Sequence, residues 1–343
     1  MKLIQTFGKK PFGQHQQKIQ QSPNYRDNSF QNQHPTVMMA EGFSYTKGIW
    51  QFINKPKDTE PSKTLPSIKR DLTKVHTNAP VITWFGHSSY LIQVNGKTIL
   101  VDPVLSGNAS PFSFTTKAFA GADVYKVDDF PHIDVLLLTH DHYDHLDYDT
   151  VLKLKHKTTQ VCTSLGVSSH LVAWGYDAAT ITELDWMDTK LLPGGLSLTA
   201  APARHFSGRG FVRGKTFWSS FVLKTPGHTL YLGGDSGYDT HFATIANLFG
   251  PFDIALLECG QYNTNWPQIH MMPEQTVQAA VDLQAKLLLP VHWSKFSLAL
   301  HPWNEPVKRV TAQAHALNVN ITTPMIGEAV TLGEAYPQGQ WWL

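Results

Sequence analysis

The stretch Thr139-His140-Asp141-His142-Tyr143-Asp144-His145 contains the pattern His-x-His-x-Asp-His. It directly follows the apolar run of residues 133–138, which is typical of a buried strand. Imidazole and carboxylate groups are the usual protein ligands of zinc and related divalent metals. Burying this many polar groups together without a cation would leave them poorly compensated. The stretch therefore predicts a metal site at the mouth of a strand.

Three later segments share one layout, in which an apolar strand leads to a residue that can bind a metal. The pairs are residues 196–200 with His205, residues 230–232 with Asp235, and residues 287–291 with His292. In layered α/β folds, ligand sites gather beyond the carboxyl ends of strands. Taken singly, each such residue is more often structural than functional. Together they give seven candidate ligands, which suits two metal ions: His140, His142, Asp144, His145, His205, Asp235 and His292.

The 343-residue chain has an ordinary globular composition, with 42% hydrophobic and 16% charged residues. Its net charge of +1 gives no broad attraction to nucleic acid, so a nucleic-acid partner is not expected. The two cysteines, Cys162 and Cys259, form no CxxC motif and predict buried, reduced thiols. The apolar runs fall short of the ~20 residues of a membrane span, and no secretory signal is recognisable. These features predict a cytoplasmic protein.

The composition of the sequence changes near residue 78, where short β-rich segments begin. Residues 1–77 are predicted to form an N-terminal arm, polar over 14–35, and residues 78–343 a catalytic domain. We expect residues 36–75 to wrap partly over the domain, because this part of the arm carries an apolar group that needs burial. The group comprises Phe43, Tyr45, Ile49, Trp50 and Phe52.

The domain alternates short β-rich and helical segments. Strands are predicted at 81–85, 90–94, 98–101, 133–138, 160–163, 180–184, 196–200, 219–225, 229–232, 287–291 and within 321–330. Helices are predicted at 148–155, 167–174, 239–249, 273–283 and 306–316, the first with Asp147 as its N-cap. Asn95-Gly96 indicates a hairpin turn, and residues 104–127 read as a long loop.

Four motifs in chain order, THDHYDH, ARH, GGDSGY and PVHW, resemble the metallo-β-lactamase superfamily. The chain is more closely similar to the branch that contains N-acylphosphatidylethanolamine-hydrolysing phospholipase D. The further matching stretches are WFGHSS (84–89), VDP (101–103), FGPFD (249–253) and HMMPE (270–274). The resemblance covers about residues 78–333. It implies an α+β fold of four layers, an αββα sandwich with two mixed β-sheets flanked by helices.

The same resemblance implies how the candidate ligands divide. His140, His142 and His205 would hold one ion, and Asp144, His145 and His292 the other, with Asp235 bridging the two. Histidine at the second motif position separates the chain from di-iron, oxygen-reducing relatives, which have glutamate there. Zinc is the first expectation for both ions, with manganese or iron as alternatives.

The resemblance also implies a mechanism in which water activated between two divalent ions attacks a phosphorus or carbonyl centre. Asp144 would orient that water, and His270 is expected to act in catalysis near the substrate. His87 and Tyr143 are further candidates for substrate contact. Asp102 either supports a metal-binding histidine or forms a strand-end turn with Pro103. Ile269 departs from the glutamine of the mammalian phospholipase, which puts its particular lipid specificity in doubt.

The expected function is that of a phosphodiesterase of phospholipase D type, an enzyme of lipid metabolism that touches the membrane peripherally. Two alternatives stay open: hydrolysis of a soluble lactone or cyclic sugar-phosphate, and a non-catalytic metal-binding scaffold. The sequence carries no signal of oligomeric state. Aromatic side chains that either line an acyl channel or simply pack are Phe112, Phe114, Phe119, Phe206, Phe211, Phe217 and Trp266.

Overall fold

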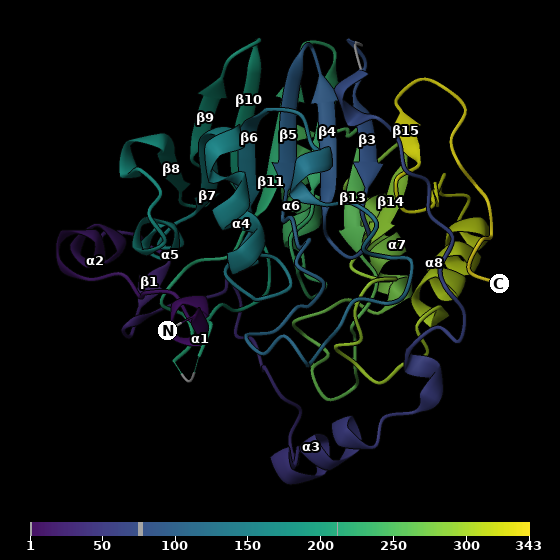
Figure 1. Ribbon diagram of the computed structural model, residues 1–343, viewed down its shortest axis with the longest axis horizontal. Helices are drawn as coiled ribbons and strands as arrows, with labels where there is room; N and C mark the ends of the chain where they lie inside the picture. Colours follow the sequence, from purple (N-terminus) through teal and green to yellow (C-terminus); the bar gives the residue numbers. More distant parts are fainter. Residues whose placement is uncertain (1, 75–77, 211) are drawn as a thin grey trace.

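Figure 1 shows the protein as a computed structural model, which describes residues 2–74, 78–210 and 212–343. Two β-sheets lie face to face. Within the described residues, the first sheet has seven strands. Their spatial order is β15 (Ala329–Thr331), β3 (Val81–Trp84), β4 (Tyr90–Val94), β5 (Lys97–Val101), β6 (Ile133–Leu138), β7 (Thr158–Ser164) and β8 (Ile181–Leu184). The second sheet has six strands in that part of the chain. Their order is β14 (Leu288–Val291), β13 (Ile254–Glu258), β12 (His228–Leu232), β11 (Ser220–Thr225), β10 (Leu196–Ala201) and β9 (Thr189–Leu192).

Both sheets are mixed. Neighbouring strands from β5 to β8 and from β12 to β14 are parallel, and the other pairs are antiparallel. Helices α4 (Tyr148–Leu154) and α5 (Ser168–Ala173) cover the first sheet. Helices α6 (His241–Phe249), α7 (Pro273–Asp282) and α8 (Glu305–Ala316) cover the second. The four-layer fold predicted from the sequence is confirmed.

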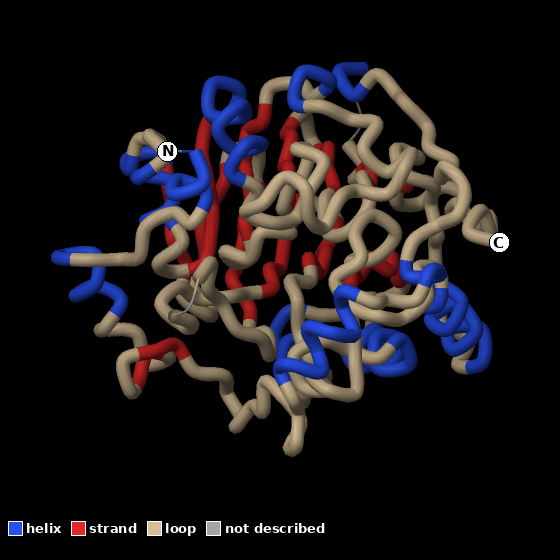
Figure 2. The backbone as a smooth tube through the Cα atoms, turned by 60° about the horizontal axis from the view of Figure 1, so that its bottom comes forward, coloured by secondary structure: helices blue, strands red, loops and turns tan. Residues whose placement is uncertain are grey.

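The alternation of side chains along β4 shows why the layers form. Tyr90, Ile92 and Val94 face the core between the sheets, where they join Phe221 and Leu223 of β11. Leu91 and Leu100 point to the other face and pack with Val151 of α4 and Leu171 of α5. Because successive side chains of a strand point to opposite faces, apolar residues at every position require cover on both sides. The long loops gather along the lower edge of the sheets in Figure 1, an edge that Figure 2 brings forward.

Two strands of the large sheets were not predicted from the sequence. β9 is an edge strand, and its Thr189 and Leu191 are exposed, so its pattern does not stand out from a loop. β13 is buried at every position and shows no alternation, but its apolar residues 254–257 form a run like that of β14, which was predicted. The missing β13 matters for function, because its last residue, Glu258, reaches the candidate site.

Asp147 stands at the N-cap position of α4, as predicted, but its side chain does not cap the helix backbone. Its Oδ2 instead accepts hydrogen bonds from the backbone N–H groups of Leu105 (3.3 Å) and Ser106 (3.0 Å). The carboxylate therefore ties the start of the long 104–127 loop to the start of α4. Cys162 and Cys259 are buried and unpaired.

The N-terminal arm packs onto the domain, with Leu65 and Leu72 in its core clusters, but not through the aromatic residues that were expected to do so. It contains α1 (Lys2–Thr6), α2 (Gly13–Ile19), β1 (Tyr25–Arg26), β2 (Ser29–Phe30) and α3 (Tyr45–Ile53). Residues of the polar 14–35 stretch are buried, since Ile19, Tyr25 and Phe30 form a cluster with Phe217 and Trp218. The burial expected for Trp50 and Phe52 is wrong: they are 66% and 42% exposed on α3, which stands away from the sheets in Figure 1. Phe43 is half-buried, and the side chains of Tyr45 and Ile49 lie outside the described residues.

Candidate metal centre

The seven candidate ligands come from different segments and meet at one place. The His-x-His-x-Asp-His motif follows β6, His205 lies four residues beyond β10, Asp235 follows β12, and His292 directly follows β14. Within the described residues, side chains that can bind a metal form three groups here, and two of them contain all seven candidates. The first comprises His140, His142, His205 and Asp235, and the second comprises His87, Asp144, His145 and His292. The third joins Asp235 and His292 to Glu258 and His270. The structure thus brings together residues that lie up to 205 positions apart in the sequence, His87 and His292.

In the first cluster, three imidazole nitrogens face one another. Nδ1 of His142 lies 3.0 Å from Nε2 of His140 and 3.2 Å from Nε2 of His205. Oδ2 of Asp235 closes the group at 3.8 Å from His140 and 3.7 Å from His205. Burial is the main cause that lowers the pKa of all three imidazoles, so they are held in the neutral form that binds metals.

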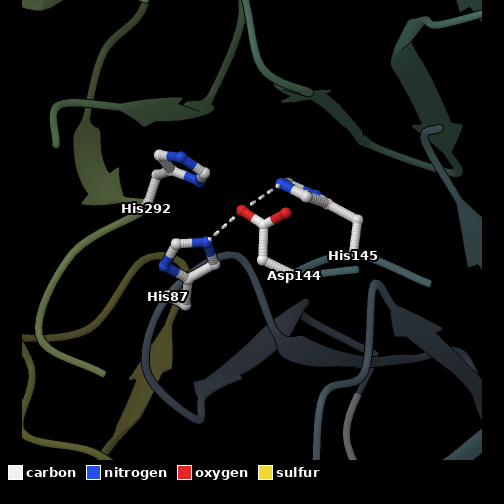
Figure 3. Close-up of side chains that lie close together, drawn as sticks. All are labelled: His87, Asp144, His145 and His292. Atoms are coloured by element: carbon white, nitrogen blue, oxygen red, sulfur yellow. Dashed lines mark hydrogen bonds and ion pairs between the residues drawn. The ribbon is translucent and has the colours of Figure 1, made fainter. Parts of the chain in front are cut away.

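The second cluster is shown in Figure 3, where Asp144 lies between His87 and His145 and His292 lies opposite. Oδ2 of Asp144 is 2.9 Å from Nε2 of His87 and 3.5 Å from Nε2 of His145. Asp235 also reaches this cluster, with Oδ2 3.2 Å from Nε2 of His145 and Oδ1 3.1 Å from Nδ1 of His292. One carboxylate therefore contacts histidines of both clusters.

The clusters fit divalent metal ions. Nε2 of His145 and Nε2 of His292 are buried and make no hydrogen bond within the described part of the chain. The opposite nitrogen of His145, Nδ1, is held by Asp102 at 2.8 Å. Nδ1 of His292 lies between Oγ of Ser88, at 2.9 Å, and Oδ1 of Asp235, at 3.1 Å. In the same way, Nδ1 of His205 donates to the backbone oxygen of Ile269. This arrangement, one nitrogen oriented by a partner and the other left open, is the usual environment of a metal-binding histidine.

Asp102 both lies in a turn at the end of a strand and contacts a candidate metal-binding histidine, so the two interpretations of this residue are compatible. It stands at the end of β5 in a left-handed conformation, with φ of 40°. Its Oδ1 accepts from the backbone N–H of Thr139, and its Oδ2 accepts from Oγ1 of Thr139 and contacts Nδ1 of His145. The Asp102 carboxylate therefore contacts both Thr139 and His145, the first and last residues of the quoted stretch.

His270 faces the clusters from the loop before α7. Its Nδ1 lies 2.6 Å from Oε2 of Glu258, a residue that the sequence reasoning missed. Burial alone would lower the pKa of His270, but the carboxylates of Glu258, Asp235 and Asp144 together raise that pKa to about 9. Burial raises the pKa of Glu258 to about 7. Had β13 been recognised, the rule of polar residues at strand exits would have found Glu258.

The two remaining predicted site residues differ in exposure. His87 is fully buried against Asp144. Tyr143 donates from its hydroxyl to the backbone oxygen of Arg209 at 2.6 Å, and its ring lies 4.0 Å from the Arg209 guanidinium. It lines a cavity of about 250 Å³ together with Phe112 and Phe114.

The other aromatic candidates for an acyl channel lie in different surroundings. Phe119 and Phe217 are buried in core clusters, and Phe206 contacts His142 with ring centroids 4.6 Å apart. Phe211 lies outside the described residues. Trp266 lines an apolar cavity of about 290 Å³ beneath α3.

Fold and site together define a metal-dependent hydrolase. Residues 97–293 match the family model of the beta-lactamase superfamily domain, and the chain belongs to the metallo-β-lactamase superfamily. An uncharacterized protein of Mycobacterium tuberculosis is 37% identical over 328 residues, covering 94% of this chain and 88% of that protein. An N-acyl-phosphatidylethanolamine-hydrolyzing phospholipase D of Caenorhabditis elegans is 27% identical, covering 80% of this chain and 83% of that protein. Igni18, a metallo hydrolase of Ignicoccus hospitalis, shares the fold with a TM-score of 0.58 and 20% identity, over 75% of this chain and all of that one.

Proposed function

We propose that the protein is a dinuclear metal-dependent phosphodiesterase of phospholipase D type that acts on an N-acylphosphatidylethanolamine-like phospholipid. The observation that carries the dinuclear part is the position of Asp235, whose carboxylate contacts histidines of both clusters. A shared carboxylate is the usual bridge between two ions ~3.5–4 Å apart. The phospholipase part is supported by the similarity to the nematode enzyme.

His140, His142 and His205 would hold one ion, Asp144, His145 and His292 the other, and Asp235 both. Divalent ions, zinc first among them, would lower the pKa of water and stabilise negative charge on a phosphoryl oxygen. Burial lowers the pKa of His140, His205 and His292 and so favours the neutral form that binds a metal. His87 keeps the Asp144 carboxylate in place through the 2.9 Å contact, a role that suits a fully buried side chain better than direct substrate contact.

His270 would transfer a proton to the leaving oxygen. Its Nδ1 is fixed by Glu258, and its Nε2 makes no hydrogen bond within the described residues. Its ring centroid lies 5.0 Å from that of His205 and 5.2 Å from that of His292. A group at this distance from both clusters can reach an atom that the clusters hold.

The apolar cavity beneath α3 supports a lipid substrate. It is lined by Phe43, Phe52 and Ile53 of the arm side, and by Trp266, Leu298 and Leu300 from the loops on either side of the site. No helix in the described part of the chain is long and apolar enough to cross a bilayer. Access to lipid would therefore be peripheral, through exposed side chains such as Trp50 and Ile53.

The test compares hydrolysis of N-acylphosphatidylethanolamine vesicles, bis(p-nitrophenyl) phosphate and a lactone panel, with metal content measured in parallel. Asp235→Ala and Asp144→Asn are each expected to lose bound metal and at least about 100-fold in activity. Full activity and two bound ions in both variants would exclude the dinuclear mechanism. A strong preference for lactones would overturn the phospholipid assignment while leaving the metal centre intact.

A further inference from the structure

The side chain of Asn32, in the N-terminal arm, makes two hydrogen bonds with the backbone of His205. Its Nδ2 donates to the carbonyl oxygen of His205 at 2.9 Å, and its Oδ1 accepts from the backbone N–H of His205 at 3.1 Å. The same Oδ1 accepts from Nε1 of Trp218 at 3.1 Å. The side-chain amide thus pairs with both backbone groups of one residue, as a neighbouring strand would.

His205 needs such a partner because it lies beyond β10, in an irregular segment without a strand beside it. Its ring is fixed separately, since Nδ1 donates to the carbonyl oxygen of Ile269. With the backbone held by Asn32 and the ring held by Ile269, Nε2 is directed to Nδ1 of His142 in the first cluster. Metal sites depend on this kind of support, which fixes where a ligand atom points.

Asn32 is itself held on both sides along the arm. Before it, the backbone N–H of Phe30 donates to the oxygen of Gly214 at 2.8 Å, and the Phe30 ring stacks on Phe217 with centroids 4.4 Å apart. After it, Arg204 donates to the oxygen of Pro35 at 2.9 Å and to Oγ1 of Thr36 at 3.0 Å. The amide therefore approaches His205 from a fixed frame, although it is 173 residues away in sequence.

The segment that Asn32 holds is also coupled to the bridging carboxylate. The backbone N–H of Arg204 donates to Oγ of Ser236 at 2.9 Å, and the backbone N–H of Gly237 donates to the oxygen of Arg204 at 2.8 Å. Asp235 directly precedes these two residues. A displacement of residues 204–205 would therefore disturb two groups of the first cluster at once.

We propose that Asn32 is a positioning residue for His205, so that the N-terminal arm is part of the framework of the first metal cluster. This inference rests on the metal-binding part of the proposed function and is independent of the substrate. Asn32 touches neither substrate nor metal in this role. It acts by holding the backbone from which the His205 ligand atom is presented.

The test uses the full chain loaded with Zn²⁺ and a chromogenic chelator that reports Zn²⁺ release. Asn32→Ala removes both halves of the amide, Asn32→Asp keeps the acceptor and removes the donor, and Gln33→Ala changes the exposed neighbour as a matched control. We expect one of two equivalents to leave Asn32→Ala about 10- to 100-fold faster than the unmodified protein. Asn32→Asp should be intermediate, and Gln33→Ala unchanged.

A purely structural Asn32 would give a different result. The metal-free Asn32→Ala protein would then melt at a lower temperature, while both Zn²⁺ equivalents left at the unmodified rate, and this outcome would overturn the proposal. If Asn32→Ala does not fold, Asn32→Asp decides by the same release rates. Failure of the unmodified protein to bind Zn²⁺ would instead count against the proposed function, so the two failures are distinguishable.

Discussion

Oδ2 of Asp102 and Nδ1 of His145 lie 2.8 Å apart, with both side chains buried. The contact sets which ring nitrogen of His145 carries the proton. A carboxylate can only accept at this position, so Nδ1 is protonated and Nε2, 3.2 Å from Oδ2 of Asp235, is the nitrogen left to bind an ion. Burial alone would lower the pKa of His145, but Asp235, Asp144 and Asp102 together raise it, so Nε2 gives up a proton when an ion binds. Asp102, at the end of β5, thereby sets the tautomer of His145, a candidate ligand in the second cluster.

Asp102→Asn tests this preparation. The new amide can keep the bond from the Thr139 backbone with its oxygen, but its NH₂ group then faces Nδ1 of His145. This favours the tautomer with the proton on Nε2, which cannot bind a metal. We expect about 10- to 100-fold weaker binding of one ion, measured by chelator competition and metal analysis. Asp134→Asn, on β6 outside the site, is the matched control and should keep both ions. Unchanged metal affinity in Asp102→Asn would contradict the tautomer argument.

Glu258 and His270 offer a second test, directed at proton transfer. In Glu258→Gln, one amide oxygen can still accept from the backbone N–H groups of Ser236 and Met271, so the local backbone keeps its partners. His270 loses its charged partner and its fixed orientation. We expect kcat to fall about 10²- to 10⁴-fold with metal content unchanged, in steady-state kinetics with bis(p-nitrophenyl) phosphate.

A double-mutant cycle with His270→Ala shows whether Glu258 acts through His270 or independently of it. If Glu258 acts through His270, the double variant should be little slower than His270→Ala alone. Additive losses would indicate that Glu258 has a separate effect, for example on the turn that carries Asp235. An unchanged kcat in Glu258→Gln would remove Glu258 from the mechanism.

The metal motif shows what could be predicted from the sequence, and Glu258 and Asn32 show what could not. The His140 to His145 motif begins, and Asp235 and His292 lie, within three residues of the end of an apolar run, and parallel strands bring such residues to one edge. Glu258 ends a buried strand without alternation, and only its apolar run, residues 254–257, could have revealed it. Asn32 lies in a polar stretch that has no pattern, and its partner is 173 residues away, so only tertiary packing reveals the contact. For Trp50 the sequence predicted burial and the structure shows exposure, because an apolar residue need not be buried when nothing packs over its helix.

The pH dependence of stability can be tested at His241, at the start of α6. The side chain is buried, and burial is the largest cause that lowers its pKa from 6.5 to about 4. Below pH 6.5 the unfolded chain binds a proton that the folded protein does not, so stability falls as the pH drops from 6.5 to 4. Each pH unit within this window costs up to about 1.4 kcal/mol from this residue.

His241→Gln removes that titration. In urea unfolding of metal-free protein, we expect the variant to lose less stability between pH 6.5 and 4 than the unmodified protein, because one fewer group takes up a proton on unfolding. His315→Gln, on the exposed side of α8, should leave the pH dependence unchanged. Parallel stability curves for His241→Gln and the unmodified protein would show that His241 is protonated in the folded state.

The last prediction concerns α3 and the lipid surface. Trp50 and Ile53 are 66% and 75% exposed, and they adjoin the apolar cavity lined by Phe52 and Trp266. Since they are largely exposed already, replacing both with Ala should leave the fold and the hydrolysis of a soluble phosphodiester unchanged. At a membrane the same side chains would leave water, so their loss should weaken binding to phospholipid vesicles by about tenfold or more.

Leu191→Ala is the matched control, because Leu191 is 77% exposed on β9, at the opposite end of the molecule from α3 in Figure 1. Co-sedimentation with vesicles and parallel assays on vesicle and soluble substrates separate the two effects. Equal losses of vesicle binding in the α3 and Leu191 variants would mean that exposed apolar area in general, and not α3, meets the lipid.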